Sequence, residues 1–279
     1  MIYYKTKEEI RIIREGGRRL AVILERLLQE IKPGVNTGYL EDIADKLIIA
    51  AGGQSAFKGY PLGKDLVFPT ILCVSINNQV VHGSALPARV IKSGDIVDID
   101  IGMEWPVTDE LRKKFQAPLN PHSSQGGFFT DMCATVGVGK ISPEARRLLK
   151  VTRECLDLAI KQIKPGRRLN DLARVIEEHA EKYNYGVVRD FVGHGVGYLP
   201  HEDPSVFNFT IADNSKDNVE LRSGMVIAIE PMINLGGWQV KTASNGFTVL
   251  TADGSLSAHF EHTVAVTEEG GEVLTWLNH

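Results

Sequence analysis

Long hydrophobic runs are missing from this chain of 279 residues, because no apolar stretch approaches the ~20 residues of a membrane-spanning helix. Cysteine is also scarce. Cys73, Cys133 and Cys155 are odd in number and lack the C-x-x-C spacing of a disulfide framework or a cysteine zinc site. The first residues, Met1–Lys5, lead directly into a charged segment without the apolar stretch of a signal peptide. We therefore expect a cytoplasmic protein with no membrane association.

An excess of positive charge is absent as well. The chain has 31 Lys and Arg against 35 Asp and Glu, a formal net charge of −4. This balance gives no reason to expect direct binding of nucleic acid or of an anionic membrane. Hydrophobic residues make up 43% of the chain and charged residues 24%, so it can bury a sizeable core and disorder is not expected.

Four carboxylates form two pairs with the same separation in the sequence. The surroundings of one pair also match: Lys92–Asp100 and Arg222–Glu230 each contain a Ser-Gly turn followed by an apolar strand that ends on a carboxylate. This pattern predicts a duplicated unit whose halves bring the four carboxylates together. Buried carboxylates repel one another strongly unless a cation lies among them. The pairs are Asp100 with Glu230 and Asp131 with Glu261, each 130 residues apart.

Helix signals repeat with nearly the same period. A capping box at Thr6–Glu9 opens one helix, which stops before Pro33-Gly34, and Ser142 followed by Pro143 opens another, which stops before Pro165-Gly166. Shorter helices are expected at 40–50 and 172–183, each followed by strands. We therefore predict an α+β fold in which pseudo-repeats of about 6–140 and 141–270 surround a central antiparallel sheet, within a single domain spanning 1–279. Two unrelated βαβ domains are the alternative, but no glycine-rich phosphate loop supports them.

The halves differ between Asp100 and Asp131. The connection at 103–127 is rich in proline, glycine and polar residues, which predicts a loop or an irregular excursion between two strands. It either overhangs the site or forms a flap on the surface.

Histidines change the expected metal. Four carboxylates alone suit magnesium or calcium, whereas an added imidazole favours Mn, Fe, Co or Zn. His194 lies between two glycines, which allow the backbone to approach a ligand closely, and is the candidate ligand. His82 is expected at the end of a short strand that follows an Asn-Asn turn. His259 and His262 flank Glu261, and we expect both to point away from the site because neighbours of an inward strand residue point outward.

The ligand types, in the order Asp, Asp, His, Glu, Glu, resemble the type I methionine aminopeptidases over essentially the whole chain. The most specific segments are 193–197 (Gly-His-Gly-Val-Gly), 201–204 (His-Glu-Asp-Pro), 228–231 (Ala-Ile-Glu-Pro) and 260–263 (Phe-Glu-His-Thr). The resemblance implies the pita-bread fold and removal of an N-terminal methionine that precedes a small residue, with N-termini of nascent polypeptides as substrates, possible proximity to the ribosome and a monomeric enzyme. It also implies two divalent ions (Co, Mn, Fe or Zn) bound by Asp100, Asp131, His194, Glu230 and Glu261.

The resemblance further implies roles for individual side chains. The two ions would activate a bridging water, and Glu230 would shuttle a proton to the leaving amine. His201 would stabilise the developing oxyanion, the alternative being that it only supports a metal ligand, and His82 would contact the substrate backbone or the leaving nitrogen. Residues that fall where the family builds its methionine pocket, although they could simply be core, are Phe57, Tyr60, Cys73 and Phe247.

The chain departs from the common family pattern around this pocket. Phe247 stands where tryptophan is common, Pro200 replaces an aromatic residue, and extra residues lie between Tyr60 and Cys73. These changes leave the chemistry intact but alter the shape of the pocket.

Two other functions are compatible with the fold. An aminopeptidase P or prolidase type of enzyme would share the five ligands, but such enzymes usually carry another N-terminal domain and have Asp after the second histidine, where this chain has Glu202. An inactive pita-bread binding module is the other alternative, although such relatives lose metal ligands that are all present here.

Overall fold

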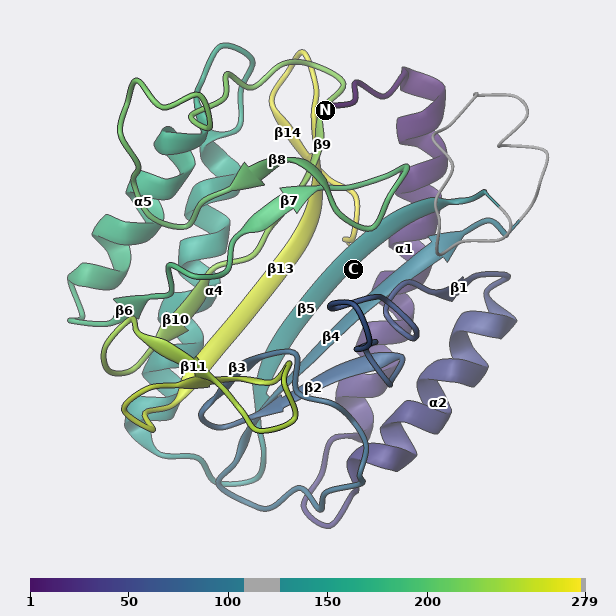
Figure 1. Cartoon of the computed structure of the whole chain (residues 1–279), viewed down its shortest axis with the longest axis vertical. Coiled ribbons are helices and arrows are strands. Elements are labelled where there is room, and N and C mark those ends of the chain that lie inside the picture. The colour runs from purple at the N-terminus through teal and green to yellow at the C-terminus, as the bar shows by residue number, and fades with distance from the viewer. Residues whose placement is uncertain (108–125, 277–279) are drawn as a thin grey trace.

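A curved antiparallel sheet runs through the middle of the computed structural model, and the helices cover one of its faces (Figure 1). The structure describes residues 1–107 and 126–276, so most of the connection at 103–127 lies outside the described residues. The helices within this described part are α1 (Lys7–Glu30), α2 (Thr37–Ala50), α4 (Pro143–Gln162) and α5 (Leu169–Glu181).

The sheet joins the two halves of the chain. Its central path runs through β1 (Gln54–Ser55), β4 (Ile96–Trp105), β5 (Phe128–Gly137), β13 (Ser257–Val266), β9 (Val226–Ile229), β7 (Gly193–Gly195) and β8 (Glu202–Val206). β2 (Leu72–Ile76) pairs with β4, β10 (Met232–Asn234) and β14 (Gly271–Val273) pair with β13, and β6 (Gly186–Val187) pairs with β10. A smaller sheet contains β11 (Val240–Thr242), β12 (Val249–Thr251) and β3 (Gln79–Val81). Because β5 pairs directly with β13, the first half continues into the second without a break.

The two long helices, α1 and α4, begin where the sequence predicts. The Thr6 hydroxyl accepts from the Glu9 backbone N–H at 3.2 Å, and the Glu9 carboxylate accepts from the Thr6 N–H at 2.7 Å, which completes the capping box. The Ser142 hydroxyl caps α4, whose first residue is Pro143. α2 and α5 each begin three residues before the predicted start, α2 after an Asn36 side-chain cap.

Each half has its own apolar core between helices and sheet. In the first half, Leu20 and Leu24 of α1 pack with Ile99 of β4; in the second, Leu148 of α4 packs with Ile227 of β9. Burying such a side chain stabilises the fold by about 1.5–3 kcal/mol. Since strand residues alternate between faces, the residues on either side of Ile99 in β4 project from the opposite face, away from the helices.

One strand boundary differs from the prediction. The apolar strand of the first half was expected to end on Asp100, but β4 continues to Trp105 because β5 pairs with it along its whole length. The corresponding expectation for the second half is confirmed, since β9 ends at Ile229, directly before Glu230.

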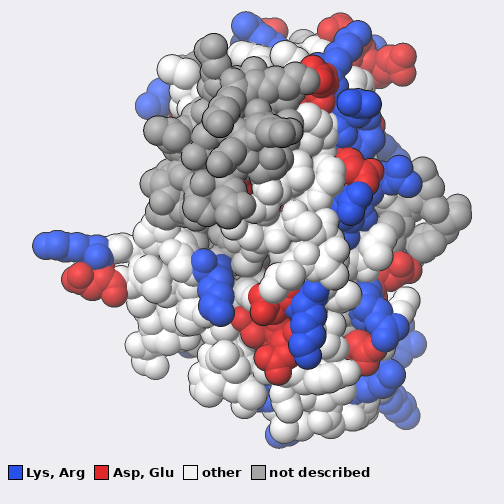
Figure 2. Space-filling view, turned by 90° about the vertical axis from the view of Figure 1, so that its right-hand side faces the viewer, with Lys and Arg blue, Asp and Glu red and all other residues white. Residues whose placement is uncertain are grey.

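Charges of both signs are intermingled on the face shown in Figure 2, as the near-neutral composition leads one to expect. Within residues 1–107 and 126–276, none of the helices is long and apolar enough to cross a membrane.

Candidate active site

Strand register brings three of the predicted carboxylates onto one face of the sheet. Cys133 of β5 pairs with Asp100 of β4 on one side and with Glu261 of β13 on the other. Asp131, two residues from Cys133 in the same strand, pairs with Gly102 in the next row. Residues two apart in a strand share a face, so the three carboxylates project together from the side opposite the helices.

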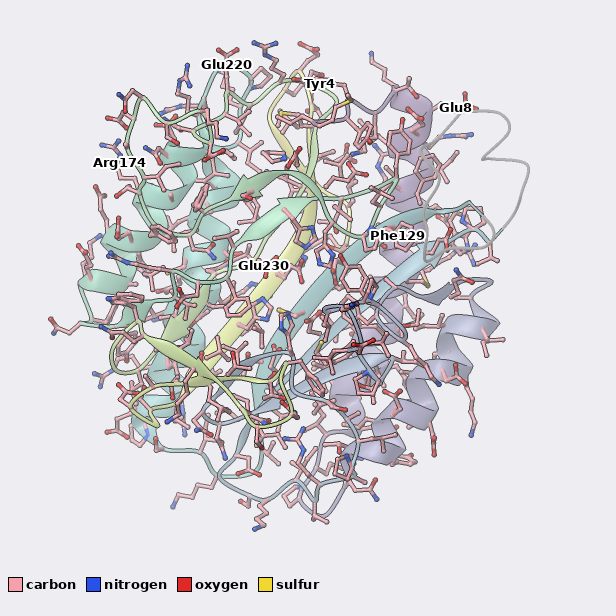
Figure 3. All side chains as sticks on the ribbon, viewed as in Figure 1. Tyr4, Glu8, Phe129, Arg174, Glu220 and Glu230 are labelled. Carbon is pink, nitrogen blue, oxygen red and sulfur yellow. The ribbon has the colours of Figure 1, made fainter. Side chains whose placement is uncertain are left out.

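Glu230 and His194 come from the second half and meet the same face. Glu230 directly follows β9, which lies between β13 and β7, and it is seen near the middle of the molecule in Figure 3. Its Oε1 is 3.4 Å from His194 Nε2. His194 Nδ1 lies 2.9 Å from the Gly195 carbonyl oxygen, which leaves Nε2 directed at the carboxylates as a possible metal ligand.

The glycines around His194 permit this close approach. A Cβ atom on Gly193 would lie 2.3 Å from the Ala228 carbonyl oxygen, and one on Gly195 would lie 2.3 Å from the Asp203 carbonyl oxygen. Such distances are well below a van der Waals contact, so a larger residue at either position would displace β7. The Gly-His-Gly sequence therefore fixes where the imidazole sits.

These groups line a cavity of about 320 Å³. It brings together all five candidate ligands, both candidate substrate-contacting histidines and three of the four residues proposed for the methionine pocket. Phe247 is the exception within the described part of the chain: it packs edge-on against Phe68, with ring centroids 5.5 Å apart, behind the cavity wall. The lining residues are Phe57, Tyr60, Leu62, Phe68, Cys73, Val81, His82, Asp100, Asp131, Phe191, Val192, His194, His201, Glu230, His259 and Glu261.

Both substrate-contacting candidates line the cavity, His82 as a partly buried residue and His201 as an exposed one. His82 follows β3 in the left-handed backbone region (φ 58°), which agrees with the predicted strand end. His201 Nδ1 lies 2.8 Å from the Tyr60 hydroxyl oxygen, and its ring centroid lies 4.4 Å from that of His194. Desolvation among the groups of the cavity lowers the pKa of His82, and desolvation followed by the nearby charge of His194 lowers the pKa of His201 well below its usual value. Both rings are therefore neutral at pH 7.

The carboxylates show the electrostatic signature of a cation site. Burial, followed by the charge of Asp131, raises the pKa values of Asp100 and Glu261 well above their usual range, and burial raises the pKa of Asp131 to about 6. Asp131 Oδ1 and Glu261 Oε1 are buried without a hydrogen-bond partner among the described residues. Asp131, His194 and Glu261 each offer one ligand atom, all within 4.8 Å of one another. A divalent cation would satisfy these oxygens and relieve the repulsion, so the residues fit a metal centre.

Comparison with known proteins agrees with this chemistry. The model of the metallopeptidase family M24 matches residues 11–109 and 123–268. The chain belongs to metallopeptidase family M24. Among its relatives, the methionine aminopeptidase of Clostridium perfringens is 41% identical over 278 residues, covering 99% of this chain and 100% of the relative. Methionine aminopeptidase 1 of Bacillus subtilis is 41% identical over 276 residues, covering 99% of each.

Solved structures give the same fold for this M24 peptidase. The methionine aminopeptidase of Thermotoga maritima has a TM-score of 0.86 and 38% identity, covering 99% of this chain and 100% of that one. The prolidase of Pyrococcus furiosus has a TM-score of 0.70 and 24% identity, covering 99% of this chain and 66% of that one. The prolidase likeness shows the fold alone. The expected α+β pita-bread architecture is thereby confirmed.

Two residues of the site were missed from the sequence. His259 was expected to point outward, which is wrong, because it lies two residues from Glu261 and therefore on the same face of β13. Asp98 stands in the same relation to Asp100 in β4. The period-two rule that places the ligands would have found both. His262, as expected, faces the other side, where its Nδ1 lies 3.0 Å from the Thr275 hydroxyl oxygen.

His259 of this M24 peptidase lies between two carboxylates. Its Nδ1 is 3.5 Å from Asp98 Oδ2 and its Nε2 is 3.5 Å from Glu230 Oε2. Burial opposes a proton on the ring, but the interactions with Asp98 and then with Glu230 are together stronger and raise the pKa of His259 well above its usual value.

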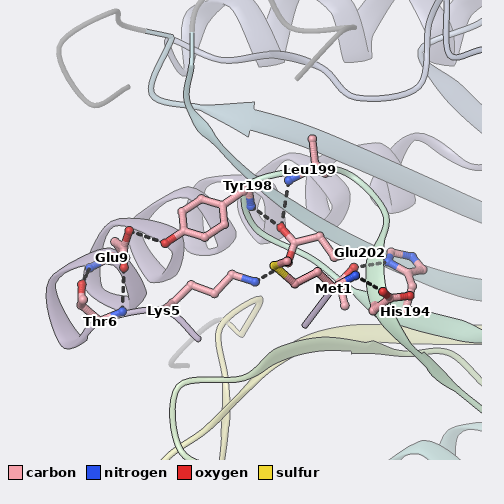
Figure 4. A network of polar contacts seen from close by, with 10 residues as sticks. Met1, Lys5, Thr6, Glu9, His194, Tyr198, Leu199 and Glu202 are labelled. Carbon is pink, nitrogen blue, oxygen red and sulfur yellow. Dashed lines mark hydrogen bonds and ion pairs between the residues drawn. The ribbon is translucent and has the colours of Figure 1, made fainter. Parts of the chain in front are cut away.

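A second buried network secures the segment that carries His201 (Figure 4). Lys5 forms an ion pair with Glu202, and both side chains are almost inaccessible to solvent. The other Glu202 oxygen accepts from the backbone N–H groups of Tyr198 and Leu199. The N-terminal segment therefore ties down the turn that leads into His201.

Proposed function

We propose that this M24 peptidase removes the N-terminal methionine from polypeptides whose second residue is small. The observation that carries the proposal is that one imidazole and four carboxylates converge on a cavity with apolar walls. Two of these carboxylates each have a buried oxygen without a hydrogen-bond partner among the described residues. The full-length likeness to methionine aminopeptidases supports the choice of substrate. The groups proposed to bind two divalent ions are Asp100, Asp131, His194, Glu230 and Glu261.

The donor set agrees with a centre of this kind. A mixed imidazole and carboxylate set favours Mn, Fe, Co or Zn over magnesium or calcium. Two divalent ions held by these residues would supply a water of lowered pKa, and so hydroxide, at neutral pH.

Neighbouring side chains complete the proposed chemistry. The Tyr60 hydroxyl can donate to Nδ1 of His201, whose neutral ring then presents Nε2–H to the oxygen on which negative charge develops. Glu230, which lines the cavity, can carry a proton to the leaving amine. His82 lines the same cavity and is proposed to contact the substrate backbone.

The apolar part of the cavity is the proposed methionine pocket. Phe57, Tyr60, Phe68 and Cys73 form its wall, and Phe247 supports that wall through Phe68 without touching the cavity. The whole cavity, with the part lined by the carboxylates included, has a volume of about 320 Å³, at the small end of the range for ligand sites, about 300–1,000 Å³, which agrees with a small substrate group.

The setting of the reaction is also a proposal. The substrates would be N-termini of nascent polypeptides, met in the cytoplasm and near the ribosome, with the enzyme acting as a monomer. All three cysteines are buried and free, which agrees with a reducing compartment. The pseudo-repeats 6–140 and 141–270 are proposed to form one domain, because the shared site draws ligands from both.

Peptide hydrolysis tests the proposal directly. Metal-free protein would be reloaded separately with Co, Mn, Fe or Zn and given Met-Ala-Ser or Ala-Pro-Ala. We expect metal-dependent release of methionine from Met-Ala-Ser that Glu230→Gln abolishes. Cleavage of Ala-Pro-Ala alone would instead indicate a proline-directed peptidase, and no cleavage with any metal despite binding of two ions would contradict the proposed pocket.

A further inference from the structure

We propose that His259, supported by Asp98, is a positioning residue that holds the Glu230 carboxylate in the orientation needed for metal binding and proton transfer. The inference rests on the proposed function, because it assigns to Glu230 the role of a metal ligand. Its ground is the continuous contact from Asp98 through the His259 ring to Glu230, in which each step is 3.5 Å.

Hydrogen bonds through Thr135 hold the strands that carry Asp98 and His259. Asp98 pairs with Thr135 of β5, and the Thr135 hydroxyl lies 3.1 Å from Asp98 Oδ1 and 2.8 Å from the His259 carbonyl oxygen. The same hydroxyl accepts from the His259 backbone N–H at 2.9 Å. One side chain therefore fixes the relative position of β4 and β13 at the level where the two polar residues face each other.

Each nitrogen of the His259 ring faces a carboxylate oxygen at 3.5 Å, a charge contact that does not meet the geometry of a hydrogen bond. The residue is 2% exposed, and neither nitrogen has a hydrogen-bond partner among residues 1–107 and 126–276. The two oxygens of Glu230 are divided accordingly: Oε1 faces His194 and Oε2 faces His259. A partner that orients a ligating side chain commonly contributes 10–100-fold to metal affinity or activity.

Asp98 and His259 form a unit. Asp98 adds a fifth carboxylate to a face that already holds four, and a buried carboxylate is costly without a donor. The groups that reach its oxygens in the described structure are Thr135 and His259. Replacing one of the two residues should therefore lower metal affinity and kcat more than replacing both with neutral amides. A double-mutant cycle measures this difference.

A separate metal site at the same residues is less favoured. Asp98, Cys133 and His259 place one potential ligand atom each within 4.8 Å of one another. Burial, followed by the charges of the surrounding carboxylates, raises the pKa of the Cys133 thiol well above its usual value. Without an ion the thiol is therefore protonated, and a metal would have to displace that proton to bind there.

The test compares His259→Gln, Asp98→Asn and the double variant with the wild-type protein. Bound metal would be counted by elemental analysis, metal affinity measured by titration calorimetry, and kcat and KM measured on Met-Ala-Ser. We expect each single variant to lose about 10–100-fold in the affinity of one of the two ions and in kcat, with KM nearly unchanged. The double variant should recover to within about tenfold of the wild type. His262→Gln, on the same strand but the opposite face, should leave all of these values unchanged.

Each other outcome overturns a defined part of the reasoning. Unchanged metal affinity and kcat in both single variants would refute the positioning role while leaving the proposed function intact. Losses that simply add in the double variant would refute the unit of Asp98 and His259. A third ion in the wild type that the double variant loses would replace the inference with a metal site. A wild type that binds no ion would refute the proposed function itself. If His259→Gln does not fold, as judged by circular dichroism, Asp98→Asn and the double variant still decide the matter.

Discussion

The Lys5–Glu202 ion pair should contribute strongly to stability, and Lys5→Met tests this. Breaking a buried pair by removing one partner costs about 3–5 kcal/mol. Glu202 would keep its two backbone donors, from Tyr198 and Leu199, so we expect the lower end of that range, about 3 kcal/mol. In a chain of this size about 3 kcal/mol corresponds to a fall of about 6–12 °C in Tm. Because Glu202 directly follows His201, we also expect kcat/KM to fall by about tenfold.

The assay is urea unfolding followed by tryptophan fluorescence and circular dichroism, with peptide hydrolysis measured on the same samples. Arg14→Met, on the helix α1 that follows Lys5, is the matched control, because Arg14 pairs with Glu272 while both side chains are more than a third exposed. Such a pair contributes about 1 kcal/mol or less. The double variant Lys5→Met with Glu202→Gln should regain about half of the loss. If Lys5→Met destabilises no more than Arg14→Met, the reasoning about the buried pair is refuted.

Three further predictions follow from the site. Gly195→Ala should displace β7 against the Asp203 carbonyl oxygen and lower metal affinity, which calorimetry would show; unchanged affinity would mean that β7 adapts. The affinity of the metal-free protein for metal should fall by about tenfold per pH unit once the pH drops below about 6. Asp131 then takes up one proton, which the metal must displace. An affinity that stays constant from pH 7.5 to 5 would contradict this. Tyr60→Phe should lower kcat more than metal affinity, since it removes the contact to His201 Nδ1 and no proposed ligand, and an equal loss in both would count against that role.

Much of the fold could be predicted because its signals are local or repeated. The cap at Thr6 and the Ser142-Pro143 start each satisfy backbone donors within one turn, so a few residues suffice to place a helix end. The repeated separation of the carboxylates required no knowledge of the strands between them. Strand ends are different, because pairing decides them: β4 continues past Asp100 because β5 lies alongside its whole length and β1 pairs near its end.

The details of the site depended on geometry that spacing alone does not supply. His259 could have been placed from the sequence, since period two puts it on the face of Glu261, but its partner Asp98 lies on a strand more than a hundred residues earlier. Phe247 has the right character for a pocket wall, yet the Phe68 ring stands in front of it. Only the packing of loops from both halves decides which aromatic side chain reaches the cavity.

Duplication accounts for the four carboxylates but not for the residues that make the two halves of the site different from each other. Shifting by the same 130 residues places Ala228 opposite Asp98 and Phe129 opposite His259, so neither member of that pair has a polar counterpart in the other half. In the second half, β7 passes the Ala228 carbonyl so closely that only glycine fits at position 193. That same passage delivers His194 to the cavity. The imidazole ligand and the Asp98–His259 pair are therefore departures from symmetry, and they act on the two oxygens of one carboxylate, Glu230, from opposite sides. A symmetric set of acids could bind two ions equivalently; the single-copy histidines distinguish the two halves of the site, which a reaction with a distinct nucleophile side and leaving-group side requires.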